Sequence, residues 1–153
     1  MSEFVDNIIV LKTNVFALTP LLVSFYRNLK SQENNILLSY FVFPIVLDKK
    51  CIEKLKNLRV TSSLSKVTKD KEIMAGFEER FDFYKDITNK CLQYAMECNY
   101  IKLSDDMSVS VPADNSLFTD AGFSESMKLA SNLYKIFKKD VINTYYEFGI
   151  KRI

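Results

Sequence analysis

Histidine and tryptophan are both missing from this 153-residue chain, and glycine, proline and cysteine occur only three times each. Without histidine the chain lacks the commonest general base and cannot form a Ser–His or Cys–His nucleophile pair. A zinc site would need a shell of thiolates and carboxylates, and the cysteines show no Cys-x-x-Cys spacing. The composition therefore predicts neither catalytic residues nor a structural metal.

The scarce glycines and short apolar runs exclude two further classes of protein. Gly76, Gly122 and Gly149 are isolated from one another, so they form no phosphate-cradling loop and no cofactor is expected. The longest apolar run, 36–47, has twelve residues, whereas a membrane-spanning helix needs about 20. The first residues are acidic where a secretory signal would be basic. We therefore expect a cytoplasmic protein that does not span a membrane.

Apolar residues are plentiful, at 48% of the chain, and aromatic residues make up 13%. A chain of this length can bury most of its apolar surface in one core, so we expect a single domain over 1–153. Cys51, Cys91 and Cys98 are interpreted as small buried hydrophobes in a reducing compartment. The formal charge of +2 is close to balance, so contact with nucleic acid would require a local basic patch.

The first part, 1–58, is predicted to be helical. Asn14 is a candidate N-cap for a helix over 15–31 that Pro20 should bend or divide. The run 36–47 is apolar on all sides and is expected to be the most buried element, with a break or bend at Phe43–Pro44. Asp48 should cap a helix over 49–57, whereas 8–11 suit either an edge strand or a helical turn.

The middle part, 59–112, has the pattern of a winged-helix module. Apolar residues three and four positions apart between Ile73 and Cys98 predict one amphipathic helix over 72–100, with a possible interruption near Asp86. The period then changes to two on either side of 104–106, which predicts a β-hairpin. A helix followed by a hairpin is how a winged-helix module ends.

A basic, hydroxyl-rich connector precedes that helix, and two interpretations of it stay open. Ser62 or Ser63 could cap a short helix through Val67. The basic side chains could then contact DNA phosphates or a partner protein, or simply face water. The candidate contact residues are Arg59, Lys66, Lys69 and Lys71 in the connector and Lys102 in the hairpin.

One acidic pair has the spacing of a catalytic carboxylate pair. Glu78 and Asp82 are four residues apart and could meet on a helix face. No apolar residues surround them to raise a carboxyl pKa, so we interpret them as a solvated helix surface.

The last part, 113–153, should contain C-terminal helices after a loop over 113–123. Ser124 is a candidate cap for an amphipathic helix through Phe137, whose lysines should face water. Asp140 and Gly149 should bound a last helix over 141–148, and 150–153 could add an edge strand. The predicted fold class is mainly α (α+β): a helical domain with a winged-helix-like helix plus hairpin.

Several blocks, in this order and spacing, resemble a known family. The chain is similar to the middle component of three-component ABC systems, in which an SMC-like ABC ATPase is encoded beside a middle protein and a variable third component. The blocks are the Asn14-led helix, 40–47, 59–64, 75–80, 92–95 and 146–152.

This resemblance implies a non-catalytic adaptor that links the ATPase to an effector in bacterial defence against phage or mobile DNA. The ABC ATPase and the effector protein of the same operon would be its partners, with DNA contact possible through the complex. A winged-helix DNA-binding regulator is the alternative, and a small enzyme is the third hypothesis.

Overall fold

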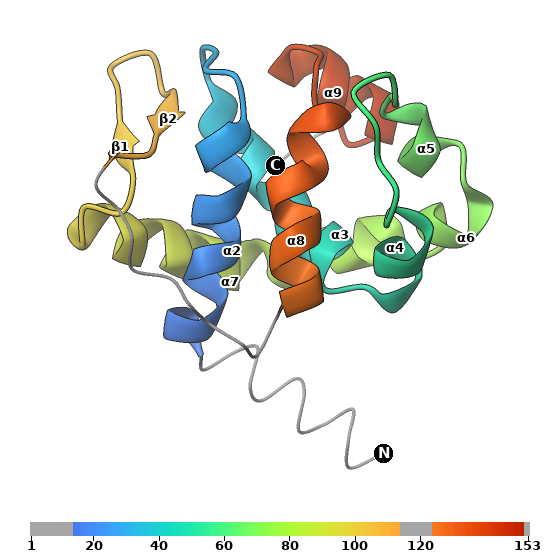
Figure 1. Cartoon of the computed structure of the whole chain (residues 1–153), viewed down its shortest axis with the longest axis horizontal. Helices are drawn as coiled ribbons and strands as arrows, with labels where there is room; N and C mark the ends of the chain where they lie inside the picture. The colour runs from blue at the N-terminus through green and yellow to red at the C-terminus, as the bar shows by residue number, and fades with distance from the viewer. Residues whose placement is uncertain (1–13, 114–123, 152–153) are drawn as a thin grey trace.

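The computed structural model describes residues 14–113 and 124–151, and most of these residues lie in helices (Figure 1). Among the described residues, the β-structure consists of one short antiparallel hairpin. The predicted α+β fold class, mainly helical, is therefore confirmed. The hypotheses for 8–11 and for most of the loop over 113–123 lie outside the described residues.

Helix α2, Val15–Asn28, starts where the sequence predicted. The Asn14 side-chain oxygen accepts a hydrogen bond from the Ala17 amide at 3.0 Å, as an N-cap does. The helix is not divided at Pro20, although proline removes one amide donor there. The neighbouring Thr19 hydroxyl donates to the Val15 carbonyl at 2.7 Å, an additional side-chain bond within the same turn of the helix.

The apolar run 36–47 forms a 3₁₀ helix, η1 (Asn35–Phe41), followed by α3 (Val42–Val46). Every residue of α3 is buried, as predicted, whereas Ile36, Leu37, Tyr40 and Leu47 of the same run are only half-buried. The 3₁₀ helix changes to an α-helix at Val42. This point lies before the Phe43–Pro44 step, where a break or bend was expected. Pro44 lies in the first turn of α3, where its missing N–H would have no intrahelical acceptor.

Three short helices follow: α4 (Lys49–Lys54), α5 (Ser65–Thr68) and α6 (Lys71–Met74). Asp48 caps α4 by accepting from the Cys51 amide at 3.1 Å, as predicted. The predicted cap of α5 is wrong, because no side chain caps this helix. The Ser62 hydroxyl instead accepts from the Arg59 amide at 2.9 Å and closes the loop before it.

Helix α7, Phe77–Glu97, is the long central helix. The predicted helix over 72–100 is divided at Gly76, which has a left-handed φ of 71°, and not at Asp86. Arg80 joins the two pieces, since its guanidinium donates to the Ile73 carbonyl at 2.9 Å and the Ala75 carbonyl at 3.0 Å. The division therefore changes the direction of the chain while leaving the two helices bonded.

Strands β1 (Lys102–Leu103) and β2 (Val109–Ser110) form the predicted hairpin, with Leu103 opposite Val109. Strand β2 is hydrogen-bonded to the start of η1, because the Asn35 side-chain oxygen accepts from the Val109 amide at 2.7 Å. The order of helix then hairpin is confirmed. The winged-helix assignment stays a prediction.

The C-terminal part contains α8 (Ser124–Asn132), a 3₁₀ turn η2 (Leu133–Lys135) and α9 (Val141–Phe148). The predicted helix through Phe137 ends early, at a point where the side chains of Ser131 and Asn132 both donate to the Lys128 carbonyl. Asp140 caps α9, and Gly149 ends it with a φ of 74°, as predicted. Ile150 and Lys151 form no strand.

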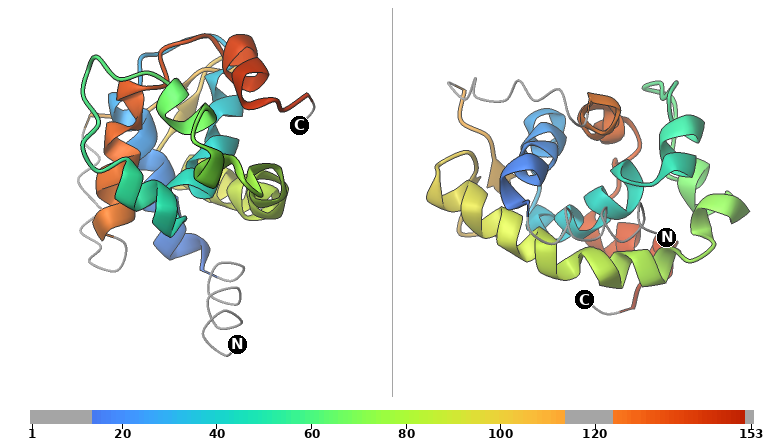
Figure 2. Two further views of the ribbon diagram at one scale, coloured as in Figure 1. Left: turned by 90° about the vertical axis from the view of Figure 1, so that its right-hand side faces the viewer. Right: turned by 90° about the horizontal axis from the view of Figure 1, so that it is seen from below.

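The core is a single cluster of buried residues that joins these elements. Seen from below, η1 and α3 lie between α7 on one side and the pair α2 and α8 on the other (Figure 2). Phe41 on η1 is in ring contact with Phe77 and Phe81 on α7, and with Tyr145 and Phe148 on α9. These aromatic contacts fix α9 against the centre of the molecule.

Candidate functional site

Four of the five predicted contact residues lie in one corner of the molecule. Lys66, Lys69 and Lys71 are exposed on or next to α5 and α6, at the right of Figure 1, and Arg59 is exposed in the loop that leads to α5. Lys102 is exposed on β1 at the left of the same view. The structure therefore gathers the four connector residues and separates Lys102 from them.

Lysines from the C-terminal part hold the connector in place. The Lys135 ammonium donates to the Leu58 carbonyl at 3.2 Å. The Lys138 ammonium donates to the carbonyls of Val60 and Ser62, the latter at 2.7 Å. The sequence predicted that these lysines face water. Lys138 is exposed as predicted, whereas Lys135 is half-buried, and each ammonium has carbonyl acceptors in the connector.

An ion pair next to α5 neutralises part of this corner. Lys139 pairs with Glu147 on α9, and the Thr68 hydroxyl donates to the same carboxylate at 3.0 Å. The Lys139 ammonium, and then the Thr68 hydroxyl, hold the pKa of Glu147 below its usual value. A hollow of about 490 Å³ lies here, lined also by Ser63, Ser65 and Lys69. An anion entering it would meet the Glu147 carboxylate as well as Lys69 and Lys139, so the carboxylate offsets part of the attraction of the two lysines for phosphate.

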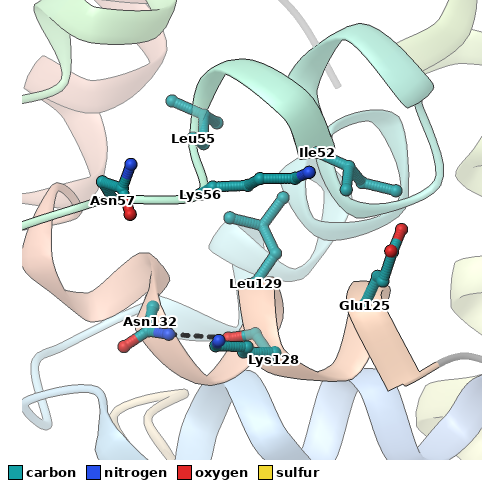
Figure 3. Close-up of a pocket in the computed structure, with 8 residues that line it drawn as sticks. All are labelled: Ile52, Leu55, Lys56, Asn57, Glu125, Lys128, Leu129 and Asn132. Atoms are coloured by element: carbon teal, nitrogen blue, oxygen red, sulfur yellow. Dashed lines mark hydrogen bonds between the residues drawn. The ribbon is translucent and has the colours of Figure 1, made fainter.

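A second hollow, of about 320 Å³, lies between α4 and α8 (Figure 3). Leu129 points from α8 toward Ile52 on α4 and Leu55 just after it, and Lys56 extends across the opening (Figure 3). Glu125, Lys128 and Asn132 complete its lining with Asn57. Mixed charges around an apolar floor give this site no single ligand preference.

The outer face of α9 exposes large apolar side chains. Ile142 and Tyr146 are 78% and 84% exposed, more than any other large apolar side chain that the structure describes. Beside them is a hollow of about 550 Å³. Its other lining residues are Leu37, Val141, Tyr145, Gly149, Ile150 and Lys151. We call these eight residues the α9 groove.

The walls of the α9 groove are held rigidly from behind. The Tyr145 hydroxyl donates to the Leu37 carbonyl, and burial raises the pKa of that phenol well above its usual value. Phe148 stacks on Phe41 with ring centroids 4.4 Å apart and on Phe77 at 5.0 Å. A helix fixed in this way can present Ile142 and Tyr146 to a partner at little cost in conformational entropy.

Sequence reasoning missed the α9 groove, although a signal was present. Ile142 and Tyr146 are four residues apart, so they share one face of the helix. The buried face is already supplied by Val141, Tyr145 and Phe148. A short helix with apolar residues beyond its core-facing stripe indicates a second contact surface.

A separate aromatic surface lies at the start of α2. Phe16 is 69% exposed and its ring meets Tyr94 of α7 edge to face at 5.0 Å. Tyr94 in turn contacts Tyr100 at 5.9 Å. We call these three residues the Phe16 surface. It is at the lower left of Figure 1, whereas α9 is at the upper right.

The thiols differ in their surroundings. Burial raises the pKa of Cys51 to about 12 and that of Cys91 to about 11, so neither is a thiolate nucleophile near neutral pH. The buried interpretation is wrong for Cys98, which is exposed at the end of α7. Among the described residues, no group of three Cys, Asp or Glu side chains could hold a metal ion.

The two carboxylates of the acidic pair, Glu78 and Asp82, lie on the exposed surface of α7, as predicted. Asp82 forms an ion pair with Lys85 at 3.2 Å, and both Glu78 and Asp82 are exposed. Within 14–113 and 124–151, no helix has the length and apolar character needed to cross a membrane.

Comparison with known proteins identifies the family of the chain. Neither the curated proteins nor the solved structures contain a significant match. A family model, described as ABC-three component (ABC-3C) system Middle Component 3, matches residues 2–152. Because this match covers nearly the whole chain, the protein belongs to the Middle Component 3 family of ABC-three component systems.

Proposed function

We propose that this protein is a non-catalytic cytoplasmic adaptor that joins the ABC ATPase of its system to the effector component. The observation that carries the proposal is the family match over residues 2–152, since it makes the chain one component of a multi-component ABC system. ATP chemistry would belong to the partner. Defence against phage or other mobile DNA is the proposed setting.

The distribution of exposed apolar side chains supports an adaptor with two contact surfaces. The α9 groove and the Phe16 surface lie on different elements and at different ends of the view in Figure 1. Contiguous apolar groups on a protein surface commonly mark contact sites. A molecule with two separated surfaces of this kind could hold two partners at once.

The test is purification of the tagged protein from cells that co-express the ATPase and the third component encoded beside it. After nuclease treatment, we expect one complex that contains all three chains in fixed proportion. The negative control is Phe41→Asp. It places a charge in the core, where Phe41 is fully buried, so it should disrupt the fold and abolish recovery of both partners. Recovery of only one partner, or of none, would contradict the adaptor proposal.

DNA binding by Arg59, Lys66, Lys69 and Lys71, which we call the basic corner, is the second candidate function. The observation in its favour is that Lys66, Lys69 and Lys71 lie exposed on or next to α5 and α6, with Arg59 exposed in the loop before them. Binding of a labelled DNA duplex should then weaken with salt, and the logarithmic slope should change by about 0.9 for each phosphate that a variant no longer neutralises. Reversal of all four charges should abolish binding, whereas Lys102→Glu, on the distant hairpin, should not. Unchanged binding by the fourfold variant would exclude this function.

A further inference from the structure

The α9 groove combines an apolar lining with a positive edge. Lys151 is its one charged lining residue, and the other seven are apolar side chains, a phenol pair and a glycine. The segment 138–151 contains three lysines and two carboxylates. Lys69 adds a further positive charge next to Glu147. Only Lys151 of these cations lines the groove, and no carboxylate lines it, so the charge of the groove edge is positive.

Both carboxylates of that segment already have partners within the protein. Asp140 accepts from the Asn143 amide at 3.0 Å as the cap of α9. Glu147 accepts from Lys139 and Thr68 on the side of α9 away from the groove. The negative charges are thus engaged in holding α9, whereas the Lys151 ammonium lies at the groove itself.

We propose that the α9 groove binds a short segment of another component of the ABC system, with an apolar side chain seated beside Ile142 and Tyr146 and a carboxylate beside Lys151. This inference deepens the proposed adaptor function and rests on it. The apolar floor supplies the affinity, because an exposed tyrosine on a rigid helix is a typical binding hot spot. The lysine selects acidic over basic segments.

Charge disfavours a second copy of the chain as the occupant. A two-fold pairing of the α9 groove with itself would bring two Lys151 side chains into one interface with no carboxylate among its lining residues. Nucleic acid is disfavoured as well, since phosphates need cations and this hollow is mostly apolar. A segment with an apolar anchor and an acidic flank fits both features of the groove.

The first experiment replaces Tyr146 with p-benzoylphenylalanine in the three-chain complex and identifies the peptide that cross-links on illumination. We expect one segment of a partner chain with an apolar residue flanked by Asp or Glu. The control position is Phe83, which is 43% exposed on α7 and should not give that product. Cross-linking to a second copy, to residues 1–13 or 152–153 of the same chain, or to nucleic acid would overturn the proposal.

The second experiment measures affinity for the partner chain identified in this way. Ile142→Asp and Tyr146→Ala should each weaken binding about tenfold or more. Lys151→Glu should weaken binding mainly at low salt. Val60→Asp is the matched control, because Val60 is also highly exposed, at 68%, but lies in the connector. All four variants should keep the melting temperature of the wild type.

The two proposals fail in different ways. If the wild type recovers neither partner, the adaptor function is wrong. If the wild type forms the three-chain complex and Ile142→Asp leaves its affinity for the ATPase and for the effector unchanged, the adaptor function stands. The α9 groove then does not bind the partner.

Discussion

At the scale of single residues, Gly76 decides how the central helix begins. Its φ of 71° is a left-handed conformation that other L residues adopt only with strain. A Cβ atom there would meet nothing closer than the Glu79 carboxylate at 3.9 Å, so the cost is confined to the backbone. We predict that Gly76→Ala lowers the free energy of unfolding by about 1 kcal/mol.

Urea denaturation would measure this change. Gly76→Asn is the matched control and should cost less, because asparagine tolerates the left-handed region better than alanine does. Equal stability of the alanine variant and the wild type would show that Gly76 does not need its left-handed φ in solution.

Individual capping residues could be predicted from the sequence, whereas the partners of the lysines could not. Asn14, Asp48 and Asp140 are predictable as caps, because a cap bonds to an amide within three residues. Lys138 bonds to Ser62, 76 residues away. No local pattern encodes that contact, so the sequence suggested only a charged side chain facing water.

At the scale of elements, Glu147 joins α9 to α5 through Thr68 and to the preceding loop through Lys139. These partners lower its folded-state pKa, so its contribution to stability is present at neutral pH and is lost as pH falls. Glu147→Gln should lower the free energy of unfolding at pH 7 by less than about 1 kcal/mol, since the pair is partly exposed.

The pH dependence of this effect tests its origin. The stability difference between Glu147→Gln and the wild type should begin to shrink near pH 4.5, where the glutamate of the unfolded chain takes up a proton, and should be lost as pH falls through the lower pKa of the folded state. Thermal denaturation from pH 3 to 7 would follow it, with the exposed Glu78→Gln as control. A difference that stays constant over this range would contradict an electrostatic role for Glu147.

Helix limits were predicted less well than helix positions. The apolar stripe in α7 is evident from its period, but its start at Phe77 depends on Gly76, which in the sequence is only an isolated glycine. The end of α8 at Asn132 likewise depends on two polar side chains that compete for one carbonyl. Both limits are set by side-chain or backbone geometry that hydrophobic periodicity does not register.

At the scale of the whole molecule, Phe41 and Phe148 connect parts of the chain that are distant in sequence. We propose that the described residues unfold together as one domain, because their buried side chains form one cluster. Phe148→Ala should then lower the free energy of unfolding by about 3 kcal/mol or more. Tyr146→Ala, on the same helix but 84% exposed, should leave it nearly unchanged.

Chemical denaturation followed by far-ultraviolet circular dichroism and by tyrosine fluorescence would test this prediction. The two signals should give one coincident transition for the wild type and for Phe148→Ala. Two separate transitions would show that the C-terminal helices form an independent unit.

Interactions that span only a few residues account for what the amino-acid sequence determined by itself. Caps, apolar stripes, the period-two pattern of the hairpin and the ordered blocks shared with middle components are all local patterns, so the helical fold class and the family followed from them. The contact surfaces arise differently. Whether Ile142 and Tyr146 are covered, and whether Lys102 joins the basic corner, depends on how distant segments meet. Packing brings Thr68 to Glu147 across 79 residues and leaves one face of α9 open, and these long-range contacts have no counterpart in the local sequence.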